Sequence, residues 1–322
     1  MDEAQSRFIF VFVDLIAPLI AGHLCNRYNL INSNICNLLV KINIRIVVSI
    51  LSFLSFWTLK ISFDLAYLPI FGVLACVIPG LIAQLTFART YKNYNNRGSY
   101  MMASMISNIG TLSGLCAFIT YGIQGFAYIQ IVAMFQALFT FTFCFPLAAY
   151  YHSKANNKKG SRKMQFNIAS LLLNWNQLPV LTMTIGFCLA LYNVPTPQIC
   201  YDIFNSLVHI GAWAGMFPVG YMIKVGKAKY YLKCTLDIAF VKFIILPVIA
   251  YFVVVNLFTD PVLIGSMVLA FSAPTAINAV LACNIYKLNI DIAIASFLFT
   301  TTLFLLIIFP FFFFIIKDLI AI

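Results

Sequence analysis

The chain has 322 residues, of which 62% are hydrophobic and only 9% are charged, and its formal net charge is +11. A soluble domain carries about 25% charged residues, so this chain has too few polar groups to cover a globular surface in water. Its apolar runs are continuous rather than alternating with a period of two, which argues against a membrane β-barrel and predicts an all-α polytopic membrane protein.

Apolar segments follow one another along the whole chain. A helix needs about 20 apolar residues to cross a bilayer, and Gly, Pro or Asn mark several of the boundaries between such segments. The pattern predicts ten transmembrane helices, at about residues 7–25, 36–58, 66–88, 99–121, 124–150, 175–193, 201–224, 230–257, 262–285 and 290–316.

The second span carries two basic residues on one helical face. Lys41 and Arg45 are four positions apart, and Arg45 lies roughly 13 Å from the cytoplasmic end of the span. Ionisable side chains are costly within a membrane and often functional there. A guanidinium can bind a carboxylate through two hydrogen bonds, which makes Arg45 a candidate substrate-binding residue. The alternative, that the side chain extends to the cytoplasmic surface, suits Lys41 better.

The fourth span contains residues that weaken a helix. It reads "ASMISNIGTLSGL" and includes Asn108, Gly110 and Gly114. Glycine weakens a helix by roughly 1 kcal/mol relative to alanine. Irregular backbone at membrane depth survives only where protein or a water-filled cavity satisfies it. We therefore expect a break near Asn108, with Asn108 and Gly110 as candidate substrate-binding residues.

One connection is long, hydrophilic and basic, at residues 152–174. It separates five spans from five spans, so the sequence predicts a first five-helix repeat at residues 1–151, a cytoplasmic linker at 152–174 and a second five-helix repeat at 175–322.

The two halves resemble each other at an offset of 164 residues. "GHLCNRYNLINSNIC" begins at Gly22 and "GFCLALYNVPTPQIC" at Gly186, and five of the fifteen positions are identical. A repeat of five spans, an odd number, places the two halves in opposite orientations, as in many secondary transporters. The same offset pairs Arg45 with His209, which adds His209 to the candidate substrate-binding residues.

The ninth span contains the stretch "AFSAPTAINAV", with Pro274 and Asn278. Proline removes an intrahelical hydrogen bond and clashes with the preceding turn. A lone proline usually marks a kink, but this one corresponds to the weak point of the fourth span. Matching breaks in the two halves of a transporter indicate a binding site, where half-helix N-termini can attract an anion. Pro274 and Asn278 complete the set of candidate residues.

The segment Val268–Pro310, "VLAFSAPTAINAVLACNIYKLNIDIAIASFLFTTTLFLLIIFP", resembles the C-terminal part of the auxin efflux carrier (PIN-like) permease family. The residues that carry the resemblance are Pro274, Ala276, Asn278, Ala282, Tyr286, Asp291 and Thr300. In the first half, Asn108 and Gly110 fit the family's Asn-x-Gly, whereas Leu115 stands where the family has proline. The resemblance implies the fold of bile-acid symporters and sodium/proton antiporters, in which broken spans 4 and 9 cross at mid-membrane. It also implies movement of small organic anions by an elevator-like mechanism.

The charges also predict an orientation. With ten spans, one face holds fourteen Lys and Arg residues, and the face with both termini holds three, Arg7, Lys60 and Lys317. The positive-inside rule then places the central loop in the cytoplasm and both termini outside a plasma or inner membrane. Because topology and anionic lipid explain the basic loops, we expect no nucleic-acid partner.

The leading hypothesis is a secondary transporter for a small organic anion, such as a carboxylate or an auxin-like acid. A cation/proton antiporter on the same fold is the alternative, but it requires paired acidic residues at the crossing. An intramembrane enzyme would need a motif such as HExxH or GxSxG, and a sensor built on a carrier scaffold would need an output domain. We expect no enzymatic activity, no cofactor and no metal site. Membrane lipid and the organic anion are the expected partners, and a homodimer remains open.

Overall fold

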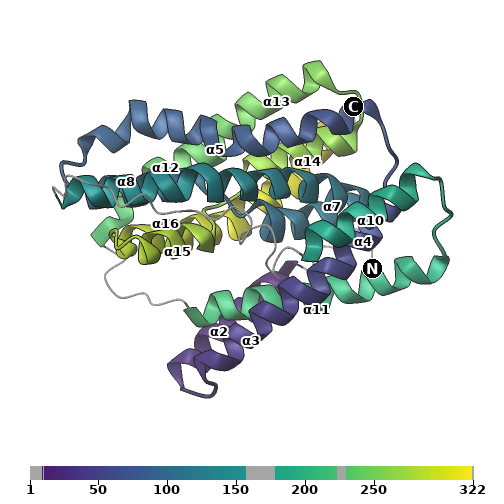
Figure 1. The fold of residues 1–322 in the computed structure, drawn as a ribbon, viewed down its shortest axis with the longest axis horizontal. Coiled ribbons are helices and arrows are strands. Elements are labelled where there is room, and N and C mark those ends of the chain that lie inside the picture. The colour runs from purple at the N-terminus through teal and green to yellow at the C-terminus, as the bar shows by residue number, and fades with distance from the viewer. Residues whose placement is uncertain (1–8, 10, 157–177, 223–229, 321–322) are drawn as a thin grey trace. The chain divides into compact units, whose positions relative to one another are not determined.

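The computed structural model describes residues 9, 11–156, 178–222 and 230–320. Over these residues all regular elements are helical, apart from one β-bridge between Ser107 and Thr275. The described residues include five helices long and apolar enough to cross a membrane: Ser33–Trp57, Phe63–Leu85, Ile109–Ala155, Thr235–Leu257 and Ile290–Ile320. The protein is therefore all-α and has the helices expected of a multi-pass membrane protein (Figure 1).

Each of the ten segments expected from the sequence contains helix in its described part. The boundary expected between the fourth and fifth spans falls inside α7, Gly114–Phe139, where Gly122 has φ 70° and ψ −156°. This backbone conformation is open to glycine and interrupts the helix at that point. Most of the predicted basic linker, residues 152–174, lies outside the described residues, which end at Asn156 and resume at Leu178.

The chain divides into two compact units. Unit 1 comprises Met1–Leu65, Gly114–Ala127 and Gln165–Ile223, and unit 2 comprises Ala66–Ser113, Tyr128–Met164 and Lys224–Ile322. Each unit draws on both halves of the sequence, so the compact units do not coincide with the predicted repeats at 1–151 and 175–322.

Unit 1 is built from helices that come in similar pairs. Its described helices are the π-helical turn Val11–Ile16, α2 (Ala17–Arg27), α3 (Ser33–Ile42), the π-helical turn Asn43–Val47, α4 (Val48–Trp57), the first part of α7, α10 (Leu178–Leu191) and α11 (Gln198–Met222). Helix α2 packs against α11, and α4 packs against α10. These two contacts use matching residues.

The two helix contacts in unit 1 depend on glycines that are 164 residues apart. A Cβ atom on Gly22 would lie 2.0 Å from the carbonyl oxygen of Phe217, and one on Gly186 would lie 2.3 Å from that of Phe53. Phe53 and Phe217 are also 164 residues apart. Each helix pair therefore approaches so closely that a side chain larger than hydrogen has no room.

The same offset relates two helix ends in unit 1. Asn29 and Asn193 both have φ 51°, a left-handed conformation that asparagine tolerates better than most residues. At each end a backbone N–H reaches back five residues, from Leu30 to Cys25 and from Val194 to Leu189, at 2.9 and 3.0 Å. The local geometry of the two segments is thus the same.

Unit 2 contains two interrupted helices. Its described helices are the 3₁₀ turn Phe63–Tyr67 in part, α5 (Leu68–Leu85), the 3₁₀ turn Phe87–Thr90, α6 (Tyr94–Met105), the π-helical turn Ile109–Ser113, the second part of α7, the π-helical turn Thr140–Cys144, α8 (Phe145–Ala155), α12 (Leu232–Phe240), the π-helical turn Val241–Ile245, α13 (Leu246–Leu257), α14 (Pro261–Phe271), α15 (Ile277–Ile285), α16 (Ile290–Leu303), the π-helical turn Phe304–Ile308, α17 (Phe309–Phe311), the π-helical turn Phe312–Ile316 and α18 (Lys317–Ile320). Helix α16 packs against α6, α12 and α15.

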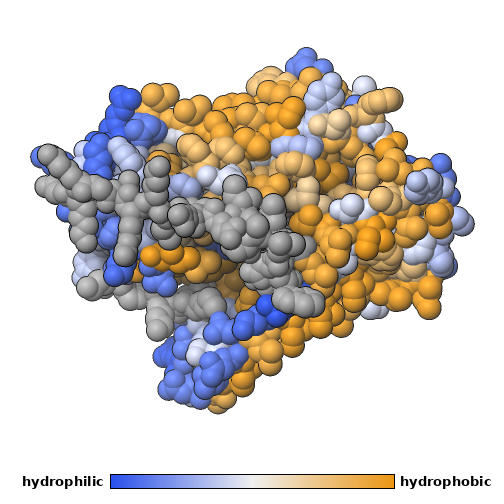
Figure 2. Space-filling model, in the orientation of Figure 1, coloured by the Kyte–Doolittle hydropathy of each residue, from blue (hydrophilic) through white to orange (hydrophobic). Residues whose placement is uncertain are grey.

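The surface of both units is rich in apolar side chains. In the view of Figure 2, hydrophobic residues cover much of the visible face. On α13 of unit 2, Val248, Phe252 and Val255 are exposed, and Phe252 retains 65% of its full accessible surface. Water would not tolerate so much contiguous apolar surface on a soluble monomer, whereas lipid chains would.

Candidate functional site

Two helices of unit 2 are interrupted at the places expected from the sequence. Helix α6 ends at Met105, and regular helix resumes at Ile109. Helix α14 ends at Phe271, and α15 begins at Ile277. Ile106 and Ala276, which flank the helices, have extended conformations. Pro274 lies in the second break, where it has no N–H to donate.

The two interrupted segments lie antiparallel and bind each other through backbone atoms. The N–H of Asn108 donates to the carbonyl of Pro274 at 2.7 Å, and the N–H of Ala276 donates to the carbonyl of Ile106 at 2.9 Å. The bonds are reciprocal, with the Ser107–Thr275 bridge between them. We call residues 106–108 and 274–276 the crossing. It satisfies backbone groups that two broken helices would otherwise leave without partners.

Buried hydroxyl groups fix the second segment of the crossing. The Thr275 hydroxyl donates to the carbonyl of Ala103 at 2.9 Å, and the N–H of Thr275 donates to the hydroxyl of Thr300 at 3.0 Å. Thr275 and Thr300 have no exposed surface. Each buried polar atom in this set has a partner, as stability requires.

Amide and amine side chains fix the first segment. Gln136 on α7 donates to the carbonyl of Ser107 at 2.9 Å, and Gln130 donates to the carbonyl of Gly110 at 2.9 Å. The Nζ atom of Lys242 donates to the Ser107 hydroxyl at 2.5 Å. No sequence pattern points to Gln136 or Ser107, whereas Lys242 is recognisable as a charge within an apolar segment.

The candidate residues of the fourth and ninth spans lie at or beside the crossing. Pro274 is buried and accepts the hydrogen bond from Asn108, whose own side chain is half-buried. Asn278 is exposed in the first turn of α15, and the N-terminus of that helix has no side-chain cap. Gly110 follows the break, where a Cβ atom would approach Ala133 to 3.1 Å. Four of the six candidates therefore belong to one small region of unit 2.

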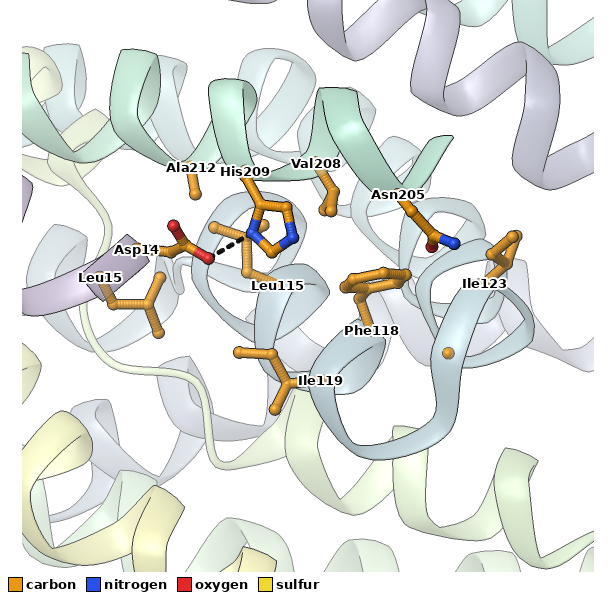
Figure 3. A pocket seen from close by; sticks show the side chains of 11 residues that line it. Asp14, Leu15, Leu115, Phe118, Ile119, Ile123, Asn205, Val208, His209 and Ala212 are labelled. Atoms are coloured by element: carbon orange, nitrogen blue, oxygen red, sulfur yellow. Dashed lines mark hydrogen bonds and ion pairs between the residues drawn. The ribbon is translucent and has the colours of Figure 1, made fainter. Parts of the chain in front are cut away.

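Unit 1 contains a pocket of about 340 Å³, which suffices for a small organic molecule (Figure 3). Most of its wall is apolar, and its polar side chains are Asp14, Asn205 and His209. The Nδ1 atom of His209 lies 2.5 Å from a carboxylate oxygen of Asp14. Figure 3 shows this pair at one end of the pocket and the Asn205 amide and Phe118 ring toward the other.

The remaining two candidates, Arg45 and His209, both belong to unit 1. His209 lines the pocket with Asp14, an acidic residue within the first predicted span. Arg45 is half-buried in the π-helical turn Asn43–Val47 and is not among the residues that line the pocket, and Lys41 is exposed. The candidates thus divide between the two units, four in unit 2 and two in unit 1.

A metal centre is not evident from the described ranges, in which no three His, Cys, Asp or Glu side chains gather closely enough to hold an ion. The buried polar groups at the crossing are hydroxyl, amide, amine and backbone groups. Such a set can bind a ligand through hydrogen bonds and dipoles.

No protein-family model matches the chain, and no curated protein matches its sequence. The geometry of the crossing and the chemistry of the surrounding side chains therefore have to support a function by themselves.

Proposed function

We propose that the protein is a secondary transporter, not an enzyme, and that it moves a small organic anion, such as a carboxylate or an auxin-like acid. The observation that carries this proposal is the reciprocal crossing of two interrupted helices in unit 2. Discontinuous helices that meet within an apolar protein are the usual binding element of secondary transporters, because their ends present unpaired backbone groups to a substrate.

The chemistry at the crossing favours an anion. Helix α15 begins at Ile277 without a side-chain cap, so its first N–H groups and its dipole are available to a negative charge. Asn278 in that first turn is exposed and offers amide N–H donors. Ser107, Asn108, Pro274 and Thr275 contribute no carboxylate. This composition makes the cation/proton antiporter the weaker alternative.

We further propose ten spans arranged as two inverted five-helix repeats. The support lies in unit 1, where Gly22 with Phe217 and Gly186 with Phe53 make the same close contact at an offset of 164 residues. Asn29 and Asn193, which both have a left-handed backbone conformation, are also separated by 164 residues. A pseudo-twofold relation between two modules makes them contact each other through equivalent residues. Alternating access of an elevator type and substrate-binding roles for Arg45 and His209 belong to the same proposal.

The orientation and family are part of the proposal as well. The charge asymmetry supports a cytoplasmic central loop and external termini in a plasma or inner membrane. The resemblance to auxin efflux carriers centres on Pro274 and Asn278, and both belong to the interrupted segment between α14 and α15 or to the turn that follows it. Auxin-like indole acids are therefore among the first substrates to test.

The test is counterflow in proteoliposomes. Purified protein is reconstituted with an internal panel of unlabelled dicarboxylates, amino acids and indole acids, and uptake of each radiolabelled compound is measured with and without a proton gradient. We expect accumulation of at least one carboxylate. Asn278→Ala should lower that accumulation at least about tenfold, because the variant loses a donor that contacts the charged group.

Asn284→Ala is the matched control. Asn284 is an exposed asparagine at the other end of α15, so its variant changes the same side chain on the same helix away from the crossing. It should transport as well as the unmodified protein. If the two variants lost transport equally, or if Asn278→Ala kept full transport, the binding site would not be at the crossing.

A further inference from the structure

Lys242 is the largest charged side chain that the structure buries completely. It lies in the π-helical turn Val241–Ile245, between α12 and α13, and none of its surface is exposed. Its Nζ atom donates to the hydroxyl of Ser107, the central residue of the first crossing segment. The carrier function proposed above gives this lysine no task.

The surroundings of Lys242 are polar but do not provide an acidic partner. Gln136 donates to the carbonyl of Ser107, and the Cys76 thiol of α5 lies 3.9 Å from the hydroxyl of Thr140. Over the described part of the chain, no carboxylate forms an ion pair with Lys242. Burying an unpaired ammonium group is strongly unfavourable, so other groups must offset this cost.

The helix ends at the crossing can offset it. Helix α6 ends at Met105, two residues before Ser107, and the C-terminal end of a helix carries a partial negative charge. A cation at this point is favoured by the carbonyl dipoles of the broken helix, as the opposite end of a broken helix favours an anion.

We propose that Lys242 is a tethered counter-cation of the crossing: its ammonium group donates to the Ser107 hydroxyl and holds the first segment in place. Lys242 is a positioning residue rather than a substrate ligand, because it is fully buried and does not line the pocket that contains His209. The inference rests on the proposed carrier function only in taking the crossing as the binding element.

The first test replaces the tether by a free cation. Lys242→Ala leaves a space beside Ser107 that methylammonium can enter. We expect the unfolding temperature of the purified variant in detergent to be about 2 °C or more higher in methylammonium chloride than in choline chloride at equal ionic strength. The unmodified protein should show no such difference. Lys154→Ala, which removes an exposed lysine of the same unit, should behave like the unmodified protein.

The second test removes the charge but keeps the length of the side chain. Lys242→Met fills the space without a donor, so methylammonium should have no effect on its unfolding. Hydrogen exchange of peptides that contain residues 106–108 should accelerate at least about tenfold, because a hydrogen bond from a charged donor is lost. A side chain that merely fills space would leave this exchange unchanged.

Either of two results would overturn the proposal. The first is an unfolding temperature of Lys242→Ala that is no higher in methylammonium than in choline. The second is an unchanged rate of hydrogen exchange at residues 106–108 in Lys242→Met. Both measurements use unfolding and exchange rather than transport. Failure of the counterflow assay would therefore count against the carrier function and leave the role of Lys242 to be decided separately.

Discussion

The two units share one means of bringing helices together and differ in a second. The shared means is a glycine at a close helix contact, since a Cβ atom on Gly72 of unit 2 would also lie only 2.5 Å from a carbonyl oxygen, that of Val132. In unit 1, unbroken helices approach until glycine is the only residue that fits, as at Gly22 and Gly186, and the contact is backbone against backbone. In unit 2, α6 and α14 are interrupted, and buried polar groups around Thr275 and Lys242 replace the missing helical bonds. The helix contacts at Gly22 and Gly186 therefore depend on the absence of side chains, whereas the crossing of unit 2 depends on side-chain hydrogen bonds.

The largest effect is expected from filling the helix contacts of unit 1. Gly22→Ala and Gly186→Ala should each lower the free energy of unfolding by about 3 kcal/mol, because the added Cβ atom meets a carbonyl oxygen that cannot move aside alone. Thermal unfolding in detergent measures the loss. The two variants should be equal if the contacts are equivalent.

Gly122→Ala provides the comparison for the glycine variants. Gly122 has φ 70°, but no atom lies within 4 Å of an added Cβ, so the substitution brings only backbone strain. Because glycine alone readily adopts φ 70° with ψ −156°, that strain should cost about 1–3 kcal/mol. A loss at Gly122 as large as at Gly186 would contradict the close-contact explanation.

An intermediate effect is expected from removing one hydroxyl at the crossing. Thr275→Val keeps the shape of the side chain but leaves the carbonyl of Ala103 without its donor, which should cost about 1–3 kcal/mol of unfolding free energy. Thr142→Val removes an exposed hydroxyl that bonds within its own helix and should cost less than about 0.5 kcal/mol. Equal losses would mean that the crossing does not depend on this bond.

The smallest effect is expected at the pocket of unit 1. Asp14→Asn keeps a hydrogen-bonding partner for His209 but removes the negative charge, and the His209 side chain is 35% exposed. We expect a loss of about 0.5–1.5 kcal/mol. Asp202→Asn, an exposed change on the helix that carries His209, should be neutral within about 0.5 kcal/mol, and identical behaviour of the two variants would show that the Asp14–His209 pair adds no stability.

Much of the helical layout follows from the sequence because apolar runs of membrane length leave few alternatives. The breaks near Asn108 and Pro274 were also predictable, since Gly and Pro oppose helix by local mechanisms that do not depend on the rest of the fold. The β-bridge between Ser107 and Thr275 was not, because it joins residues 168 positions apart. No local pattern encodes such a contact.

The site shows the same division between local and distant information. Lys242 is recognisable as a charge in an apolar span, but its bond to Ser107 depends on tertiary packing. His209 entered through an internal sequence offset, yet its observed partner is Asp14, 195 residues away. The compact units also mix the two sequence halves, because close packing joins helices irrespective of their order along the chain.

The reciprocal bonds of the crossing fix its register. Asn108 bonds Pro274 and Ala276 bonds Ile106, so each three-residue segment has one donor and one acceptor at matching distances from its centre. Lengthening or shortening either segment by a single residue would misalign both bonds and point Ser107 or Thr275 in the opposite direction. Insertions and deletions should therefore be tolerated in the connections between helices, while the spacing from Met105 to Ile109 and from Phe271 to Ile277 admits no change.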